Sequence, residues 1–334
     1  MSFHVRVADS EIAFSCASDE SILDAAERAG FSIPYSCRKG VCNTCEGALV
    51  AGEVLVRGRC VAGKVDAVLM CQARPCSDVD IAPKRIETSA PPLRKILTAT
   101  VFRLARPAPD VSLLTLRFAN GVRARFQAGQ YLQVLMPDGD RRNFSMANAP
   151  NDNDGVELHI RRIPGGRFSE VVLATLRPGD KLGVELPFDQ FYLREAATPA
   201  ILLATGTGFA PIKSIIEGAL RRGARRPTRL YWGGRRRDDL YLLDRVAKWA
   251  DRAPWFSVVP VLSEGGGDWK GRTGLVHRAV LEDNPDMENV DVYACGNPLM
   301  IAAARKEFGK EARLPEARFC ADAFVASGRS ELAV

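Results

Sequence analysis

The sequence lacks any hydrophobic run long enough to cross a membrane. Although 46% of its 334 residues are hydrophobic, no apolar stretch reaches the roughly 18 residues that a transmembrane helix needs. Residues 1–7 lack the apolar core of a signal peptide and are typical of a strand. With nine cysteines and no export signal, the sequence predicts a cytoplasmic protein whose thiols bind metal and do not form disulfides.

The sequence also has no internal repeat, no low-complexity tract and no nucleic-acid-binding motif, so we expect neither a membrane nor a nucleic acid as partner. Its net charge of +6 is unevenly distributed. Residues 1–90 carry 10 Lys and Arg against 12 Asp and Glu, and the remainder carries 36 against 28. That basic excess suits an anionic dinucleotide, and a solvated surface is the alternative.

Four cysteines, in contrast, form a recognisable pattern. Cys37, Cys42 and Cys45 have the C-x4-C-x2-C spacing of a plant-type [2Fe–2S] site, and Cys71 supplies a distant fourth thiolate. A structural zinc site usually pairs two C-x2-C knuckles, and this chain has one. Cys76 competes with Cys71 for the fourth position. The pattern predicts a protein that transfers single electrons.

Residues 1–82 are expected to form a small sheet packed on one helix, as in a β-grasp ferredoxin. The runs Phe3–Ala8 and Glu11–Cys16 predict a hairpin. A helix is expected over Ile22–Ala29, with Ser21 and Asp24 as a capping box and Gly30 as its stop. Further strands are expected at Gly47–Val56 and Val79–Ala82.

A polar, proline-containing linker is expected at about residues 83–95. Beyond it, alternating runs broken by Gly and Pro predict an antiparallel barrel, with one helical interval at Ser169–Leu176. The expected barrel strands are Leu97–Leu104, Ser112–Phe118, Tyr131–Met136, Val156–Ile163 and Lys181–Glu185.

The last third of the chain alternates short apolar strands with helices, which is typical of a parallel α/β sheet. The expected strands are Ala200–Ala204, Arg229–Trp232, Ser257–Val261 and Asp291–Ala294, and a helix is expected over Ile212–Arg222. The length agrees with two or three domains. The fold class is therefore multidomain, α+β and α/β: a β-grasp ferredoxin, an antiparallel β-barrel and a parallel α/β domain.

Two glycine-containing turns follow strands of the expected parallel sheet. The first, Thr205-Gly206-Thr207-Gly208, opens a helix, where bare backbone and the helix N-terminus favour phosphate. It lacks the third glycine of the G-x-G-x-x-G pattern, so a simple tight connection is the alternative. The second, Cys295-Gly296-Asn297-Pro298, occupies an equivalent position, and both turns are expected to line one crevice.

With these motifs, the chain resembles the ferredoxin–NADP⁺ reductase superfamily, and within it the reductase components of aromatic-ring oxygenases that carry an N-terminal plant-type ferredoxin. The resemblance covers nearly the whole chain. It implies a [2Fe–2S] ferredoxin domain at 1–90, an FAD-binding β-barrel domain at 96–196 and an NAD(P)-binding α/β domain at 197–334. The family pattern around Leu69-Met70-Cys71-Gln72 favours Cys71 over Cys76 as the fourth ligand.

The resemblance also implies the flavin site. The family's Arg-x-Tyr/Phe-Ser pattern appears as Arg142-Asn143-Phe144-Ser145, its ribityl-contacting strand as His159-Ile160-Arg161-Arg162, and its phosphate segment as Gly165-Gly166-Arg167-Phe168-Ser169. Ser145 is expected near flavin N5, and Arg142 near negative charge on the flavin or its phosphates. Phe144 can stack on the ring but lacks the hydroxyl of a tyrosine. An ordinary barrel position is the alternative for each.

The nicotinamide side is implied by the turns Thr205–Gly208 and Cys295–Pro298. Cys295 resembles the family cysteine beside nicotinamide C4, and we favour a positioning role over a nucleophilic one. Phe324 resembles an aromatic that covers the flavin, with a core position as the alternative. Arg235 and Arg236 follow a strand where this family meets the adenosine ribose, which leaves NADH and NADPH both open.

Together these features predict an enzyme that passes electrons from NADH or NADPH to FAD, then to [2Fe–2S], and then to the Rieske protein of an aromatic-ring dioxygenase through transient docking of the ferredoxin domain. A plant-type cluster is reducing enough to supply a Rieske centre. The alternatives are a reductase for a diiron monooxygenase or a deoxysugar dehydrase, and a redox sensor without turnover.

Overall fold

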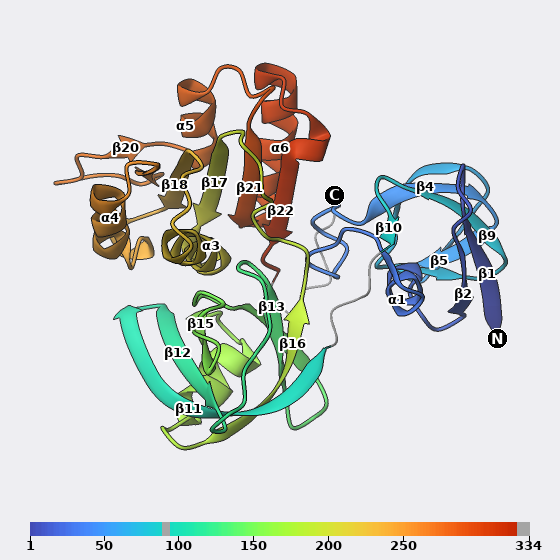
Figure 1. Ribbon diagram of the computed structural model, residues 1–334, viewed down its shortest axis with the longest axis horizontal. Coiled ribbons are helices and arrows are strands. Elements are labelled where there is room, and N and C mark those ends of the chain that lie inside the picture. The colour runs from blue at the N-terminus through green and yellow to red at the C-terminus, as the bar shows by residue number, and fades with distance from the viewer. Residues whose placement is uncertain (89–93, 326–334) are drawn as a thin grey trace. The chain divides into compact units, whose positions relative to one another are not determined.

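The computed structural model describes residues 1–88 and 94–325, and it divides the chain into two compact units, Met1–Leu93 and Arg94–Val334 (Figure 1). Part of the expected linker, including Pro91 and Pro92, lies outside the described residues. No helix within the described ranges is long and apolar enough to span a membrane.

The first unit is built on a five-stranded sheet of order β2-β1-β9-β4-β7, in which β1 and β9 are parallel. A second sheet, β6-β5-β8, and the pair β10-β3 complete it. The strands are β1 (Ser2–Val7), β2 (Ala13–Ala17), β3 (Phe31–Ser32), β4 (Glu46–Ala51), β5 (Glu53–Val56), β6 (Arg59–Ala62), β7 (Val65–Leu69), β8 (Ala73–Pro75), β9 (Val79–Pro83) and β10 (Glu87–Thr88).

One helix, α1 (Ile22–Arg28), packs its apolar face into the core of this unit. Its start is as predicted, because the Ser21 hydroxyl accepts a hydrogen bond from the backbone N–H of Asp24 at 3.1 Å. The predicted hairpin is confirmed by the antiparallel pairing of β1 with β2. Sheet and helix together give the β-grasp arrangement expected from the sequence.

The predicted strand Gly47–Val56 is wrong in one respect, since it is two strands that belong to different sheets. The break falls at Gly52, whose φ of +90° is unfavourable for any residue with a side chain. A Cβ atom there would lie 2.3 Å from the carbonyl oxygen of Asp78. Backbone crowding against β9 therefore fixes the point where the chain leaves the first sheet.

The second unit begins with an antiparallel six-stranded barrel of order β14-β13-β16-β11-β12-β15, closed by a bridge between Met146 and Leu158. Its strands are β11 (Lys95–Ala108), β12 (Val111–Phe118), β13 (Tyr131–Leu135), β14 (Arg141–Ser145), β15 (Gly155–Arg161) and β16 (Lys181–Phe188). The expected helix at Ser169–Leu176 is a π-helical segment, η1 (Arg167–Val172), followed by one turn of α2 (Leu173–Thr175).

The rest of the unit is a parallel sheet of order β20-β19-β18-β17-β21-β22, flanked by helices as expected. The strands are β17 (Ala200–Thr205), β18 (Thr228–Gly234), β19 (Phe256–Leu262), β20 (Arg272–Thr273), β21 (Asp291–Gly296) and β22 (Phe319–Ala323). The helices are α3 (Phe209–Arg221), α4 (Leu243–Arg252), α5 (Val276–Asp283) and α6 (Pro298–Ala312), with short turns η2 (Gly206–Gly208), η3 (Arg237–Asp239) and η4 (Glu316–Arg318).

We call residues 94–196 the barrel half and residues 197–325 the sheet half. Each has its own hydrophobic core. Both halves belong to one compact unit, and α3 faces the barrel in Figure 1. The boundary near residue 196 is retained as a proposal, which is supported by the end of β16 at Phe188 and the start of β17 at Ala200.

Replacing Gly52 by alanine tests the crowding that separates β4 from β5. Overpacking costs about 1–3 kcal/mol, and the left-handed backbone adds about 1 kcal/mol. We expect Gly52→Ala to lower the opening free energy of peptides from β4 and β9, measured by hydrogen–deuterium exchange in the full chain. Gly63→Ala is the matched control, because Gly63 has a φ of +75° and nothing within 4 Å of its Cβ position. Equal losses in both variants would contradict the packing explanation.

Candidate functional site

The four predicted cluster ligands lie together in the first unit. Cys37, Cys42 and Cys45 are buried, and Cys71 is partly exposed. Among the described residues no three ligand-type side chains are arranged for a single metal ion. The thiols instead form two hydrogen-bonded pairs, Cys37 with Cys42 and Cys45 with Cys71. Cys76 is exposed and lies beside Cys60, so the structure brings Cys71, not Cys76, to the loop.

The loop directs hydrogen-bond donors at sulfur. The hydrogen bond with Cys42 is the largest influence that lowers the pKa of Cys37 to about 7, and the backbone N–H groups of Lys39 and Val41 reinforce it at 3.3 and 3.5 Å from the sulfur. The side-chain amide of Gln72 donates to the Cys71 sulfur at 3.6 Å. Donors of this kind stabilise negative charge on cluster sulfurs. Four soft ligands with such donors fit a [2Fe–2S] cluster.

Two predicted flavin segments meet in the barrel half. The rings of Phe144 on β14 and Phe168 on η1 are 4.9 Å apart, and Ser145 is buried at the end of β14. Asn143 accepts a hydrogen bond from Gln133 at 3.1 Å. At Gly166 a Cβ atom would lie 2.6 Å from the Ser169 hydroxyl, so there is no room for a side chain at this position. A bare segment beside an aromatic pair fits a planar ring with a phosphate tail.

The two predicted phosphate-binding arginines are paired with carboxylates of a single turn. Arg142 pairs with Asp140, and Arg167 pairs with Asp138. These aspartates lie in the connection between β13 and β14. The arginines are thus held on the rim of the barrel by anionic partners of the kind that a phosphate would replace.

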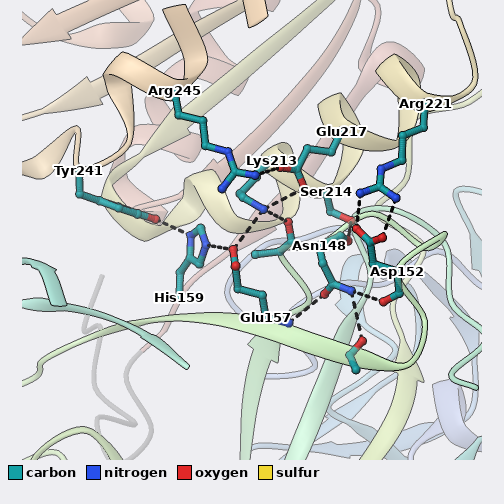
Figure 2. Close-up of polar contacts among 12 residues, drawn as sticks. Asn148, Asp152, Glu157, His159, Lys213, Ser214, Glu217, Arg221, Tyr241 and Arg245 are labelled. Atoms are coloured by element: carbon teal, nitrogen blue, oxygen red, sulfur yellow. Dashed lines mark hydrogen bonds and ion pairs between the residues drawn. The ribbon is translucent and has the colours of Figure 1, made fainter. Parts of the chain in front are cut away.

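Strand β15 places its predicted residues on two faces. Ile160 enters the barrel core, whereas His159 and Arg161 point to the sheet half. The His159 ring is hydrogen-bonded to Glu157 at 2.9 Å and to the Tyr241 hydroxyl at 2.7 Å (Figure 2). Arg161 pairs with Asp239 of η3. Flavin contacts by His159 and Arg161 stay predictions, and what the structure records is their role in joining the halves.

The two glycine-containing turns of the sheet half touch each other. The backbone N–H of Asn297 donates to the Thr205 hydroxyl at 2.9 Å. A Cβ atom at Gly208 would lie 2.4 Å from the carbonyl oxygen of Cys295, which only glycine avoids. Asn297 caps α6 through the N–H of Leu299, and Pro298 occupies the first turn, where its missing N–H costs nothing.

A cavity of about 340 Å³ opens at the carboxyl ends of these strands, and its lining includes residues from both turns. Its polar lining comes from Thr205, Arg235, Ser263, His277 and Asn297, and it contains no carboxylate. Bare glycine backbone and a helix N-terminus fit the phosphates of a dinucleotide. A larger open groove of about 1000 Å³ lies at the opposite ends of the strands and contains none of the predicted site residues.

Cys295 is fully buried, and burial, followed by the charge of Asp322, raises the pKa of its thiol well above the ordinary value. Its sulfur lies 3.8 Å from an oxygen of Asp322. A thiol held neutral is a poor nucleophile, which agrees with a positioning role. Phe324 is tied to the same turn by its N–H, which donates to the Gly296 carbonyl at 2.8 Å, and it packs on the core of the sheet half.

Sequence reasoning missed four residues that the structure brings to these sites: Lys213, Asp239, Tyr241 and Asp322. Only Lys213 carried a usable signal, because a lysine and a glutamate four residues apart interrupt the apolar run of α3. The other three gain their partners through tertiary contacts. Asp322, for example, lies opposite Cys295 because β21 and β22 pair in parallel.

Comparison with known proteins finds three family matches along the chain. Residues 5–76 match the 2Fe-2S iron-sulfur cluster binding domain, residues 101–192 the oxidoreductase FAD-binding domain, and residues 202–306 the oxidoreductase NAD-binding domain.

Relatives of similar length are also found. The chain is 39% identical to the reductase component 1 of terephthalate 1,2-dioxygenase from Comamonas sp., over 98% of each chain. It is 35% identical to the CDP-6-deoxy-L-threo-D-glycero-4-hexulose-3-dehydrase reductase of Yersinia pseudotuberculosis, over 98% of this chain and all of the other. The crystal structure of the Amycolatopsis cytochrome P450 reductase GcoB has a TM-score of 0.76 at 31% identity, covering 97% of this chain and 100% of that one.

A full-length likeness of this kind and three matching domains identify the cofactors as well as the fold. The chain belongs to the ferredoxin–NADP⁺ reductase superfamily, among the reductases that join a plant-type [2Fe–2S] domain to FAD-binding and NAD-binding domains, and it is an oxidoreductase that transfers electrons from NAD(P)H through FAD to [2Fe–2S].

Proposed function

We propose that this protein is the reductase component of an aromatic-ring oxygenase system and that it delivers single electrons to a Rieske protein of the terephthalate dioxygenase type. One observation carries the proposal: a single chain holds the four-thiol loop, the barrel with its aromatic pair and the dinucleotide crevice. The relatives support the choice of partner, since the terephthalate dioxygenase reductase is more similar (39%) than the hexulose dehydrase reductase (35%).

The bound groups supply the redox chemistry: a flavin accepts a hydride and releases electrons one at a time, and an iron–sulfur cluster carries one electron. The chain's own residues bind and orient. The turn Gly206–Gly208 and the N-terminus of α3 would hold the dinucleotide phosphates, and the neutral thiol of Cys295 would lie on the nicotinamide side. Ser145 and Arg142 of β14 would hold the flavin, and Phe144 with Phe168 would provide an apolar wall that excludes water.

In the first unit, Cys37, Cys42, Cys45 and Cys71 would hold the cluster, and the N–H donors at Cys37 and Cys71 would favour its more negative state. We propose that the partner docks transiently on this unit. The cluster loop is its electron outlet because the other redox groups belong to the second unit.

Reconstitution tests the proposed partner. We expect the purified protein, with NADH or NADPH, to support product formation by a Rieske-type aromatic-ring dioxygenase such as terephthalate dioxygenase. The control is a hexulose dehydrase or a diiron hydroxylase component supplied in the same way, which we expect to turn over at least about 10-fold more slowly, as for mismatched transient partners. Faster support of either control would contradict the assignment.

A serine at Cys42 separates the two electron-transfer stages. Because a hydroxyl is a poor iron ligand, we expect Cys42→Ser to abolish the EPR signal of the reduced [2Fe–2S] cluster while NAD(P)H still reduces the flavin. Cys76→Ser is the matched control and should leave both signals intact. Loss of the cluster in Cys76→Ser, with retention in Cys71→Ser, would reassign the fourth ligand.

The cavity lining favours a nucleotide with a 2′-phosphate. Dehydrogenases that prefer NADH commonly place a carboxylate on the ribose hydroxyls, and no carboxylate lines this cavity, whereas Arg235 does. Within the described residues its guanidinium has no recorded ion pair, unlike Arg237, which pairs with Asp244.

We therefore expect Arg235→Ala to lower kcat/KM about 10-fold for NADPH, since a hydrogen bond to a charged group contributes about 1.5–3 kcal/mol, and to change kcat/KM for NADH little. Steady-state kinetics with both nucleotides measures this difference. Arg237→Ala serves as the control for loss of a nearby positive charge. An equal loss for both nucleotides in Arg235→Ala would place this side chain away from the 2′ position.

A further inference from the structure

A buried lysine joins the two halves of the second unit. Lys213, in the second turn of α3, is 1% exposed. Its ammonium lies 3.0 Å from the carbonyl oxygen of Ala147, 3.1 Å from a carboxylate oxygen of Glu157 and 2.9 Å from one of Glu217 (Figure 2). An ammonium has three protons, so these acceptors use all of them. Two of the three belong to the barrel half.

Further partners complete a charge-balanced group. Arg245 of α4 donates to the second oxygen of Glu217 at 2.7 Å. Burial alone would raise the pKa of Glu157, but the hydrogen bond from His159 and the charge of Lys213 lower it to about 2. Two cations therefore face two carboxylates. We call Lys213, Glu157, Glu217, His159, Tyr241 and Arg245 the junction network.

His159 extends this network as a neutral ring. Burial is the main cause that lowers the pKa of His159, and burial also raises the pKa of Tyr241 well above its ordinary value. The Tyr241 hydroxyl is thus the donor to Nδ1, and Nε2–H donates to Glu157; this tautomer is assigned from the partners. The resulting line of hydrogen bonds runs from the sheet half to strand β15.

The network reaches the Gly206–Gly208 turn, which would hold the dinucleotide. Tyr241 packs edge-on against Trp232 at 5.4 Å, and the ring of Trp232 stacks on Phe209, the first residue of α3, at 3.9 Å. The indole N–H of Trp232 donates to the carbonyl oxygen of Gly206 at 3.2 Å. Tyr241 therefore contacts His159 of strand β15 directly, and it reaches the Gly206–Gly208 turn through Trp232.

We propose that the junction network, with the Lys213–Glu157 pair at its centre, is the positioning element for hydride transfer and fixes the distance between the nicotinamide and the flavin. The inference rests on the proposed function. Reacting atoms must approach to roughly 3–3.5 Å, and a shift of about 1 Å can cost on the order of 100-fold in rate. Lys213 and its acceptors sit where such a shift between the halves would have to occur.

One other ion pair between the halves lies at the surface. Arg221 of α3 pairs with Asp152 of the barrel half, but both side chains are nearly half exposed. Water can replace either partner of an exposed pair, and such pairs contribute little. A buried ammonium has no such replacement. Arg221 therefore provides the matched control: the same helix, the same two halves, and a different burial.

The test replaces Lys213 by methionine in the full protein with its cofactors bound. We expect Lys213→Met to slow flavin reduction by saturating NADPH at least about 10-fold in stopped-flow experiments. The Kd for NADPH, the FAD content and the cluster absorbance should stay within about 3-fold of wild type. The substitution is expected to slow hydride transfer and not to weaken the binding of NADPH or the cofactors. The deuterium isotope effect with C4-deuterated NADPH should not fall, which shows that hydride transfer is the slowed step.

Three further variants make the result specific. Arg221→Ala should leave the reduction rate within about 2-fold, as for an exposed pair. Lys213→Met combined with Glu157→Gln should be no slower than Lys213→Met alone, as expected for residues that act as a pair. Tyr241→Phe removes one hydroxyl from the network and should also slow flavin reduction, by a smaller factor than Lys213→Met and with little change in Kd or cofactor content. This variant tests the proposal if Lys213→Met does not fold.

A wild-type rate of flavin reduction in both Lys213→Met and Tyr241→Phe would overturn the positioning role. A loss of FAD or a large rise in Kd, with the isotope effect abolished, would also overturn it, since those changes indicate a binding or structural role. Failure of the wild-type protein to reduce its flavin with NADPH or NADH is a different result and refutes the proposed function itself.

Discussion

The ammonium of Lys213 is buried, and acceptors from both halves of the second unit surround it. Taking one ion out of water costs several kcal/mol even after relaxation. Separating the barrel half from the sheet half would leave Lys213 and Glu157 unpaired in the interior, so the two halves form one unit. This constraint fixes the positions of strand β15, the Gly206–Gly208 turn and the crevice relative to one another.

Much of the chain could be predicted because its signals are local. The spacing of Cys37, Cys42 and Cys45 depends on a few neighbouring residues, as does the cap at Ser21. Strands with clear alternation or short apolar runs, such as β12 and β17, lie where the sequence placed them. β14 was missed as a strand, because Arg141, Arg142 and Asn143 hide any alternation, although its sequence motif was identified.

The rest could not be predicted because it depends on residues far apart in the chain. Lys213 finds two of its acceptors at Ala147 and Glu157, about 60 residues earlier. β4 and β5 separate because Gly52 meets the backbone of Asp78, which no local pattern reveals. Of the two partners of His159, Glu157 is local, but Tyr241 comes from a tertiary contact, so the sequence could identify the strand but not the direction in which its side chains point.

The connection between the two compact units has a kinetic meaning. β10, in the cluster-bearing unit, ends at Thr88 and β11 begins at Lys95, so only a short segment links that unit to the unit that carries the flavin and nucleotide sites. A short covalent tether gives its ends an effective concentration in roughly the millimolar range. Electron delivery to the cluster is then a first-order event within one molecule and is insensitive to dilution. Only the final encounter with a separate acceptor depends on how much of each protein is present.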